Sequence, residues 1–128
     1  MTNQHKMNQT VKEKWLQALR SKEYEQGRGC LKESVYDSCY SGYQDKFCCL
    51  GVLTDLYIQE NNLDWSSDSE NLFYEGLPVP DSFVCSWAGL EYANPEIKID
   101  KPFADSLAEM NDHGYSFEEI ADVIEQQL

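Results

Sequence analysis

Two neighbouring thiols, Cys48 and Cys49, are the first side chains in this sequence that could carry chemistry, and they lie in the apolar run FCCLGVL, residues 47–53. Adjacent residues of a helix point about 100° apart, so the pair is poorly placed to chelate one ion. Lys46 is the only basic residue within a turn, which leaves little to stabilise a thiolate. Because buried cysteine behaves as a small apolar residue, we predict that the pair belongs to the core. Gly51 in the same run indicates that another element packs closely there.

The remaining thiols and the two histidines do not form a metal-binding pattern. The sequence contains neither a Cys-x-x-Cys pair nor two histidines at the spacing that is typical of zinc sites. Its polar start lacks the apolar middle of a signal peptide, so we expect no export and no disulfide framework. We therefore predict no metal, no cofactor, no membrane association and a cytoplasmic location. The reactivity of the other thiols stays open: Cys30, Cys39 and Cys85.

Arg28 is the best-placed cation for holding an anion, because Gly27 and Gly29 flank it. Small neighbours let a ligand approach the backbone closely, and an arginine can bind a phosphate or carboxylate through two hydrogen bonds. The alternative is a turn arginine that pairs with one of the chain's own carboxylates. If Arg28 holds a ligand, we predict two further cations and three stacking surfaces beside it: Lys32, Lys46, Tyr36, Tyr43 and Trp87.

The charges divide the chain into two unequal parts. The net charge is −13; residues 1–46 contain 8 basic and 6 acidic residues, whereas residues 47–128 contain 2 and 17. The acidic part repels phosphates, so we expect no direct binding of nucleic acid. It suits a basic partner protein, or a protein that imitates a polyanion. It also suits a surface that is merely well solvated.

The first half predicts two helices separated by extended chain. Thr10 opens a capping box, which predicts a helix over residues 11–20. Residues 24–44 contain three glycines and four tyrosines and show no helical period, so we predict irregular or extended chain with a hairpin. Asp45 is placed to cap a buried central helix that runs to Glu60.

The second half predicts shorter elements. They are a polar loop over 64–71, a short strand over 71–74, a helix capped by Asp81 and ended by Gly89, a strand over 96–100, a helix from Pro102 to Gly114, and a last helix that starts at the capping box of residues 116–119. The whole predicts an α+β fold: one small helix-rich domain over residues 10–128, with a small antiparallel sheet and a C-terminal helix pair. Residues 1–9 are predicted to be a disordered polar terminus.

Four short motifs resemble a family of small uncharacterised proteins of bacteriophages and prophages. They are QGRG at 26–29, FCCLGVL at 47–53, WAGL at 87–90 and MNDHGYSFEEIADVIE at 110–125. The similarity covers residues 11–128 and departs from the family pattern at Met110, where the family has leucine. The family brings no established activity. The resemblance implies a phage origin and a role in the cytoplasm of an infected bacterium, where small phage proteins often counter host defence.

We expect a non-enzymatic protein that acts by binding. In the first hypothesis, a pocket with Arg28 sequesters a small anionic, nucleotide-type signal of host immunity. In the second, the acidic surface of residues 47–128 binds a basic host protein, as a nucleic-acid mimic would. The polar face of the last helix carries carboxylates but no lysine or arginine, which argues against reading DNA. His113 has no nucleophile nearby in sequence, so we do not expect a general base there. Homo-oligomers stay open.

Overall fold

Helix α2 is the centre of the structure, a computed structural model that describes residues 6–37, 39 and 42–128. The elements in chain order are α1 (Gln9–Arg20), β1 (Glu25–Gln26), β2 (Lys32–Asp37), β3 (Gly42–Phe47), α2 (Cys49–Glu60), α3 (Ser82–Ala88), α4 (Leu107–Asp112) and α5 (Phe117–Gln127). The fold is α+β, as the sequence predicts. None of the described helices is long and apolar enough to cross a membrane.

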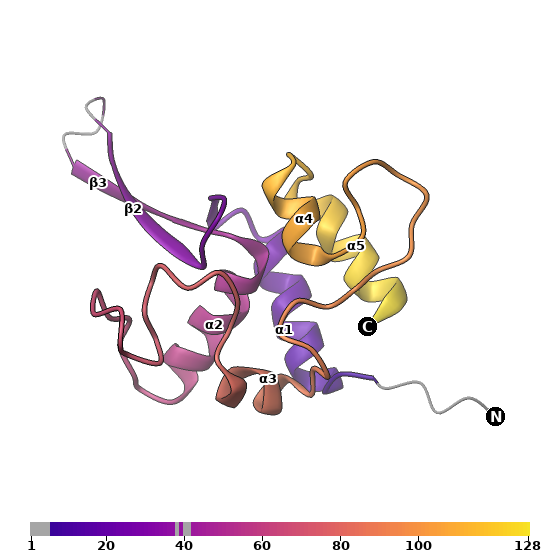
Figure 1. Cartoon of the computed structure of the whole chain (residues 1–128), viewed down its shortest axis with the longest axis horizontal. Helices are drawn as coiled ribbons and strands as arrows, with labels where there is room; N and C mark the ends of the chain where they lie inside the picture. The colour runs from indigo at the N-terminus through magenta and orange to yellow at the C-terminus, as the bar shows by residue number, and fades with distance from the viewer. Residues whose placement is uncertain (1–5, 38, 40–41) are drawn as a thin grey trace.

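The core forms around the first turns of α2, because this helix has no polar face there. Leu50, Val52 and Leu53 are fully buried, as a helix apolar on all sides must be. Figure 1 shows α1 and α2 side by side, with α5 alongside α1 so that the C-terminus of α5 lies near the start of α1. Trp15 of α1 fastens the two helices, since its indole nitrogen donates to the carbonyl of Cys49 at 2.9 Å.

The sheet is a projecting hairpin to which one short strand is added. β2 and β3 pair antiparallel, with Lys32 opposite Phe47 and Tyr36 opposite Tyr43. β1 pairs with the end of β3 in parallel, which gives the strand order β1-β3-β2. The predicted hairpin is confirmed, and the sheet is mixed rather than purely antiparallel.

The first two helices start at other residues than the capping patterns predict. Asn8, not Thr10, caps α1, and its side chain accepts from the amide of Val11. Asp45 caps no helix; it lies in β3 and accepts from the hydroxyl of Ser34 at 2.8 Å. Pairing of β3 with β2 satisfies more backbone groups than an early helix start would, so tertiary context overrides the local pattern.

Residues 96–106 also depart from the prediction. In place of a strand over 96–100, the structure has an isolated bridge between Glu96 and Ser106. Helix α4 begins after Ser106, whose hydroxyl accepts from the amide of Glu109, and so Pro102 lies outside it. Phe103 has a left-handed φ of 54° and an exposed ring, so it does not belong to the helix predicted from Pro102. The predicted strand over 71–74 is likewise only one bridge, at Tyr74.

Other predicted ends agree with the structure. Asp81 caps α3, and Gly89 ends it in a left-handed conformation. Ser116 opens a complete capping box at α5. The predicted terminus of residues 1–9 falls partly outside the described residues, but Met7 is buried and Gln9 already belongs to α1. Among the described residues, the fold therefore includes Met7 and Gln9, which the predicted terminus contains.

Candidate functional site

Cys48 and Cys49 lie in the core, as predicted, although only Cys49 belongs to α2. Cys49 is 0% exposed and Cys48 is 4% exposed. Cys48 is the N-cap of the helix, and its sulfur accepts from the amide of Gly51 at 3.3 Å. Burial raises the pKa of the Cys48 thiol to about 11 and holds the pKa of Cys49 well above its usual range. Both groups are therefore neutral thiols with a structural role.

We predict that native protein treated with iodoacetamide near neutral pH is alkylated fastest at Cys39, because Cys39 is the one exposed thiol of the five. Cys48 and Cys49 should react only after the chain is unfolded in urea. Mass spectrometry of the digested protein measures each site, and Cys49→Ala identifies the late-reacting peptide. Rapid alkylation of Cys48 or Cys49 in the native protein would contradict their burial.

The backbone amides of Gly27 and Gly29, on either side of Arg28, form hydrogen bonds within the fold. The amide of Gly27 donates to Phe47 at 2.7 Å, and the amide of Gly29 donates to the carboxylate of Asp112 at 2.9 Å. Arg28 itself is exposed and forms no hydrogen bond or ion pair with the described residues. An anion bound by Arg28 would therefore find a carboxylate, not free amides, beside it.

The other predicted cations and tyrosines lie along the hairpin. Lys32 is half-buried, forms ion pairs with Asp45 at 3.8 Å and Glu75 at 3.6 Å, and lies over the ring of Trp65. Lys46 is half-buried in β3, opposite Glu33 of β2. Farther along the same strands, two exposed rings pack edge to face, with centroids 5.5 Å apart: Tyr36 and Tyr43.

Trp87 lies at the opposite end of α2 from Arg28. Its indole nitrogen donates to Glu60 at 2.6 Å and its ring packs against Tyr57, whereas Gly27 is joined to the chain just before α2. The 12 residues of α2 separate these places by about 18 Å. Of the predicted site residues, the structure thus brings Lys46 beside Arg28 and its two glycines, since a Cβ atom on Gly27 would lie 2.9 Å from the Cβ of Lys46. Trp87 lies at the other end of α2, and Tyr36 and Tyr43 lie farther along the hairpin.

Two buried polar side chains, Asn111 and Asp55, hold core elements in place. The sequence patterns do not single out either of them. Asn111, in the last turn of α4, is 0% exposed. Its oxygen accepts from the amide of Cys49 at 3.1 Å and from Gln26 at 2.9 Å, and its nitrogen donates to the carbonyl of Gly27 at 2.7 Å. One amide thus connects α4, the start of α2 and β1. Its place in an apolar helical pattern with Leu107 and Met110 was the available sign.

Asp55 is the second such residue, a carboxylate buried in the middle of α2. It accepts hydrogen bonds from Tyr24 at 2.6 Å, Trp65 at 2.9 Å and Gln59 at 2.5 Å. Burial and the neighbouring carboxylate of Asp55 both raise the pKa of Tyr24. Three donors from the fold share this carboxylate, so Asp55 fastens the loop at Trp65 to the helix.

Carboxylates gather in residues 91–125, which we name the acidic region. It contains ten Asp or Glu and two Lys, a net charge of −8. The ten are Glu91, Glu96, Asp100, Asp105, Glu109, Asp112, Glu118, Glu119, Asp122 and Glu125, and all except Glu109 are exposed. In the described part of the chain, Arg20 is the only cation that forms ion pairs with this region, with Asp122 at 2.8 Å and Glu125 at 3.4 Å. Its charge is therefore largely uncompensated.

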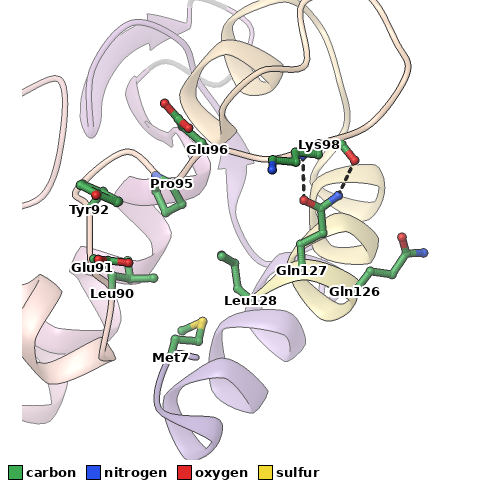
Figure 2. A pocket seen from close by; sticks show the side chains of 10 residues that line it. All are labelled: Met7, Leu90, Glu91, Tyr92, Pro95, Glu96, Lys98, Gln126, Gln127 and Leu128. Carbon is green, nitrogen blue, oxygen red and sulfur yellow. Dashed lines mark hydrogen bonds between the residues drawn. The ribbon is translucent and has the colours of Figure 1, made fainter. Parts of the chain in front are cut away.

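The acidic region borders a cavity of about 520 Å³, which we name the terminal cavity. Its lining is Met7, Leu90, Glu91, Tyr92, Pro95, Glu96, Lys98, Gln126, Gln127 and Leu128. Figure 2 shows Met7 and Leu128 pointing into the hollow between the start of α1, the loop after α3 and the end of α5. The side chain of Gln127 holds one wall, since it donates to and accepts from the backbone of Lys98 at 3.0 and 2.8 Å.

Comparison with known proteins matches the chain to the model of one family. No curated protein and no solved structure matches the chain. The model of one family, described as a domain of unknown function (DUF8296), matches residues 7–128. Its first matched residue is Met7, which is also the first buried residue of the described chain. The chain therefore belongs to the DUF8296 family.

Proposed function

We propose that this domain acts by binding a basic protein through the acidic region. The proposal rests on the uncompensated negative charge of this region. Ten carboxylates lie within 35 residues, and only Asp122 and Glu125 have a cationic partner in the described chain. Like charges held close together destabilise a fold by self-repulsion, and a partner of opposite charge removes that cost. Complementary charge also accelerates association.

The proposed partner is a protein rather than a small ligand. The exposed carboxylates are spread over a loop and two helices, α4 and α5, which makes a surface wider than one small molecule can cover. The resemblance to phage proteins extends the proposal to its setting. There the domain would bind a basic protein of the infected host in the cytoplasm, counter its action in defence, and imitate the charge of nucleic acid without catalysing a reaction.

Capture from a bacterial lysate tests this proposal with three immobilised proteins. The first is the wild type, and the second carries Asp100→Asn, Asp105→Asn and Glu118→Gln, three exposed side chains without a partner in the described chain. The third, a control with the same change of charge, carries substitutions outside the region: Glu13→Gln, Glu23→Gln and Glu25→Gln. We expect a basic protein to be retained by the wild type and the control and lost from the second protein. Identical retention by all three would contradict the proposal.

A nucleotide-type anion held by Arg28 is the second candidate. One observation favours it: the guanidinium is exposed and has no partner among the described residues. If it holds a phosphate, Arg28→Ala should weaken binding about 10- to 150-fold, since a charge-assisted hydrogen bond contributes about 1.5–3 kcal/mol. Calorimetry with cyclic and linear nucleotides measures this. Lys14→Ala is the control for loss of a positive charge at the other end of α2, where Lys14 pairs with Glu60 at 3.1 Å. No heat with any nucleotide would remove this candidate.

A further inference from the structure

The lining of the terminal cavity mixes apolar side chains with polar and charged ones. Met7 and Leu90 are almost completely buried, and Pro95 and the half-buried Leu128 complete the apolar part of the lining. Its volume of about 520 Å³ lies in the range of sites that hold organic groups. An apolar group that covers the apolar part gains free energy because it displaces water from it.

The edge of the terminal cavity carries two carboxylates without a partner. Glu91 and Glu96 are exposed, and neither side chain forms a hydrogen bond or ion pair with the described residues. Lys98 is the one cation of the lining, and its hydrogen bonds with the described residues use only its backbone. Two carboxylates and one ammonium leave the edge negative, inside a region of net charge −8. This edge therefore favours a cation beside whatever fills the hollow.

The walls of the terminal cavity are held in position by hydrogen bonds. Gln127 joins the end of α5 to the backbone of Lys98, and the amide of Met7 donates to the carbonyl of Leu128 at 3.4 Å. The amide of Asn8 donates to Ala88 at 2.8 Å, which fixes the start of α1 against the end of α3. A hollow with fixed walls binds without a large cost of ordering its own side chains.

Resting on the function proposed above, we propose that the terminal cavity is the docking site for a segment of the basic partner. An apolar side chain of that segment, of the size of leucine or phenylalanine, fills the hollow. A lysine or arginine next to it in the partner pairs with Glu91 and Glu96. Charge complementarity decides this occupant, because a neutral or acidic segment would leave both carboxylates without a partner or repel them. The segment would thus add specificity to an association that the acidic region accelerates.

A set of labelled hexapeptides tests the docking site. Each has a glycine–serine frame with a central leucine or serine, flanked by two lysines or by two glutamates. Fluorescence polarisation measures affinity, and amide chemical shifts locate the site on the full chain. We expect the leucine–lysine peptide to bind at the terminal cavity. Replacing its leucine with serine should weaken binding about tenfold or more, and the glutamate peptides should not bind.

Variants of the protein separate the two parts of the site. The double substitution Glu91→Gln and Glu96→Gln should weaken binding of the leucine–lysine peptide about 3- to 10-fold. The control with Glu13→Gln and Glu25→Gln should leave its affinity unchanged. Leu128→Trp, which enlarges a side chain that points into the hollow (Figure 2), should abolish binding with the thermal midpoint unchanged.

Three outcomes would overturn the docking site. They are equal affinity for the leucine–lysine and serine–lysine peptides, no shifts at the terminal cavity with about 1 mM peptide, and a second copy of the chain filling the hollow, detected as self-association in sedimentation. Each of these leaves the capture experiment unaffected, because the substitutions used there lie outside the lining of the terminal cavity.

Discussion

Gly51→Ala is expected to lower the free energy of unfolding by about 4 kcal/mol or more. A Cβ atom at this position would lie 1.7 Å from the carbonyl oxygen of Leu31 and 2.6 Å from its carbonyl carbon. Backbone cannot move aside as a flexible side chain can. Separating α2 from Leu31 would break the 3.2 Å hydrogen bond from Cys48 to Leu31 and disturb the bond from Leu31 to Leu77. The gain of about 1 kcal/mol in helix propensity does not offset this.

Urea unfolding followed by circular dichroism measures the loss at Gly51, and Gly29→Ala is the matched control. Gly29 has a left-handed φ of 82°, but no heavy atom lies within 4 Å of its Cβ position. Alanine there should cost only the conformational strain, about 1–2 kcal/mol. If Gly51→Ala is no more destabilising than Gly29→Ala, the close approach of Leu31 to α2 is wrong.

Asn111→Ala is expected to lower the free energy of unfolding by about 2–5 kcal/mol. The substitution leaves the amide of Cys49 and the carbonyl of Gly27 without their hydrogen bonds to the Asn111 side chain, and each unsatisfied buried group costs about 1–3 kcal/mol. For a domain whose total stability is about 5–15 kcal/mol, this is a large fraction. The same unfolding experiment measures it. Asn61→Ala is the control, because Asn61 is exposed and its side chain donates only to Tyr57; comparable losses would contradict the central role of Asn111.

Local patterns in the sequence predict elements well where one residue decides the local geometry. Asp81, Gly89 and Ser116 act at the helix ends that the capping patterns indicate. The patterns fail where a distant segment competes for the same backbone groups. Asp45 has the chemistry of a cap, yet β2 pairs with this segment and makes it a strand. The local sequence specifies the register of the hairpin only weakly, because the register depends on contacts between residues far apart.

The candidate site shows the same limit. The charge of the second half is visible in the sequence, and the acidic region follows from it. The terminal cavity does not, because its lining comes from the start of α1, the loop after α3 and the end of α5. Nothing in the spacing of Met7, Leu90 and Leu128 shows that they meet. Likewise, the chemistry of Arg28 and Trp87 predicts one ligand site, whereas in the structure the length of α2 separates the two residues.

The dependence of binding on salt tests the central claim, that the acidic region binds a basic protein, most directly. The dissociation constant of the captured partner is measured by biolayer interferometry between about 50 and 300 mM salt, a range over which screening of exposed charges becomes strong. We predict that the affinity of the wild type for this partner weakens about tenfold or more over this range. The variant with Asp100→Asn, Asp105→Asn and Glu118→Gln should bind more weakly at low salt and show a smaller slope, while the control with Glu13→Gln, Glu23→Gln and Glu25→Gln follows the wild type. A dissociation constant that does not change with salt, or equal slopes for all three proteins, would contradict the account.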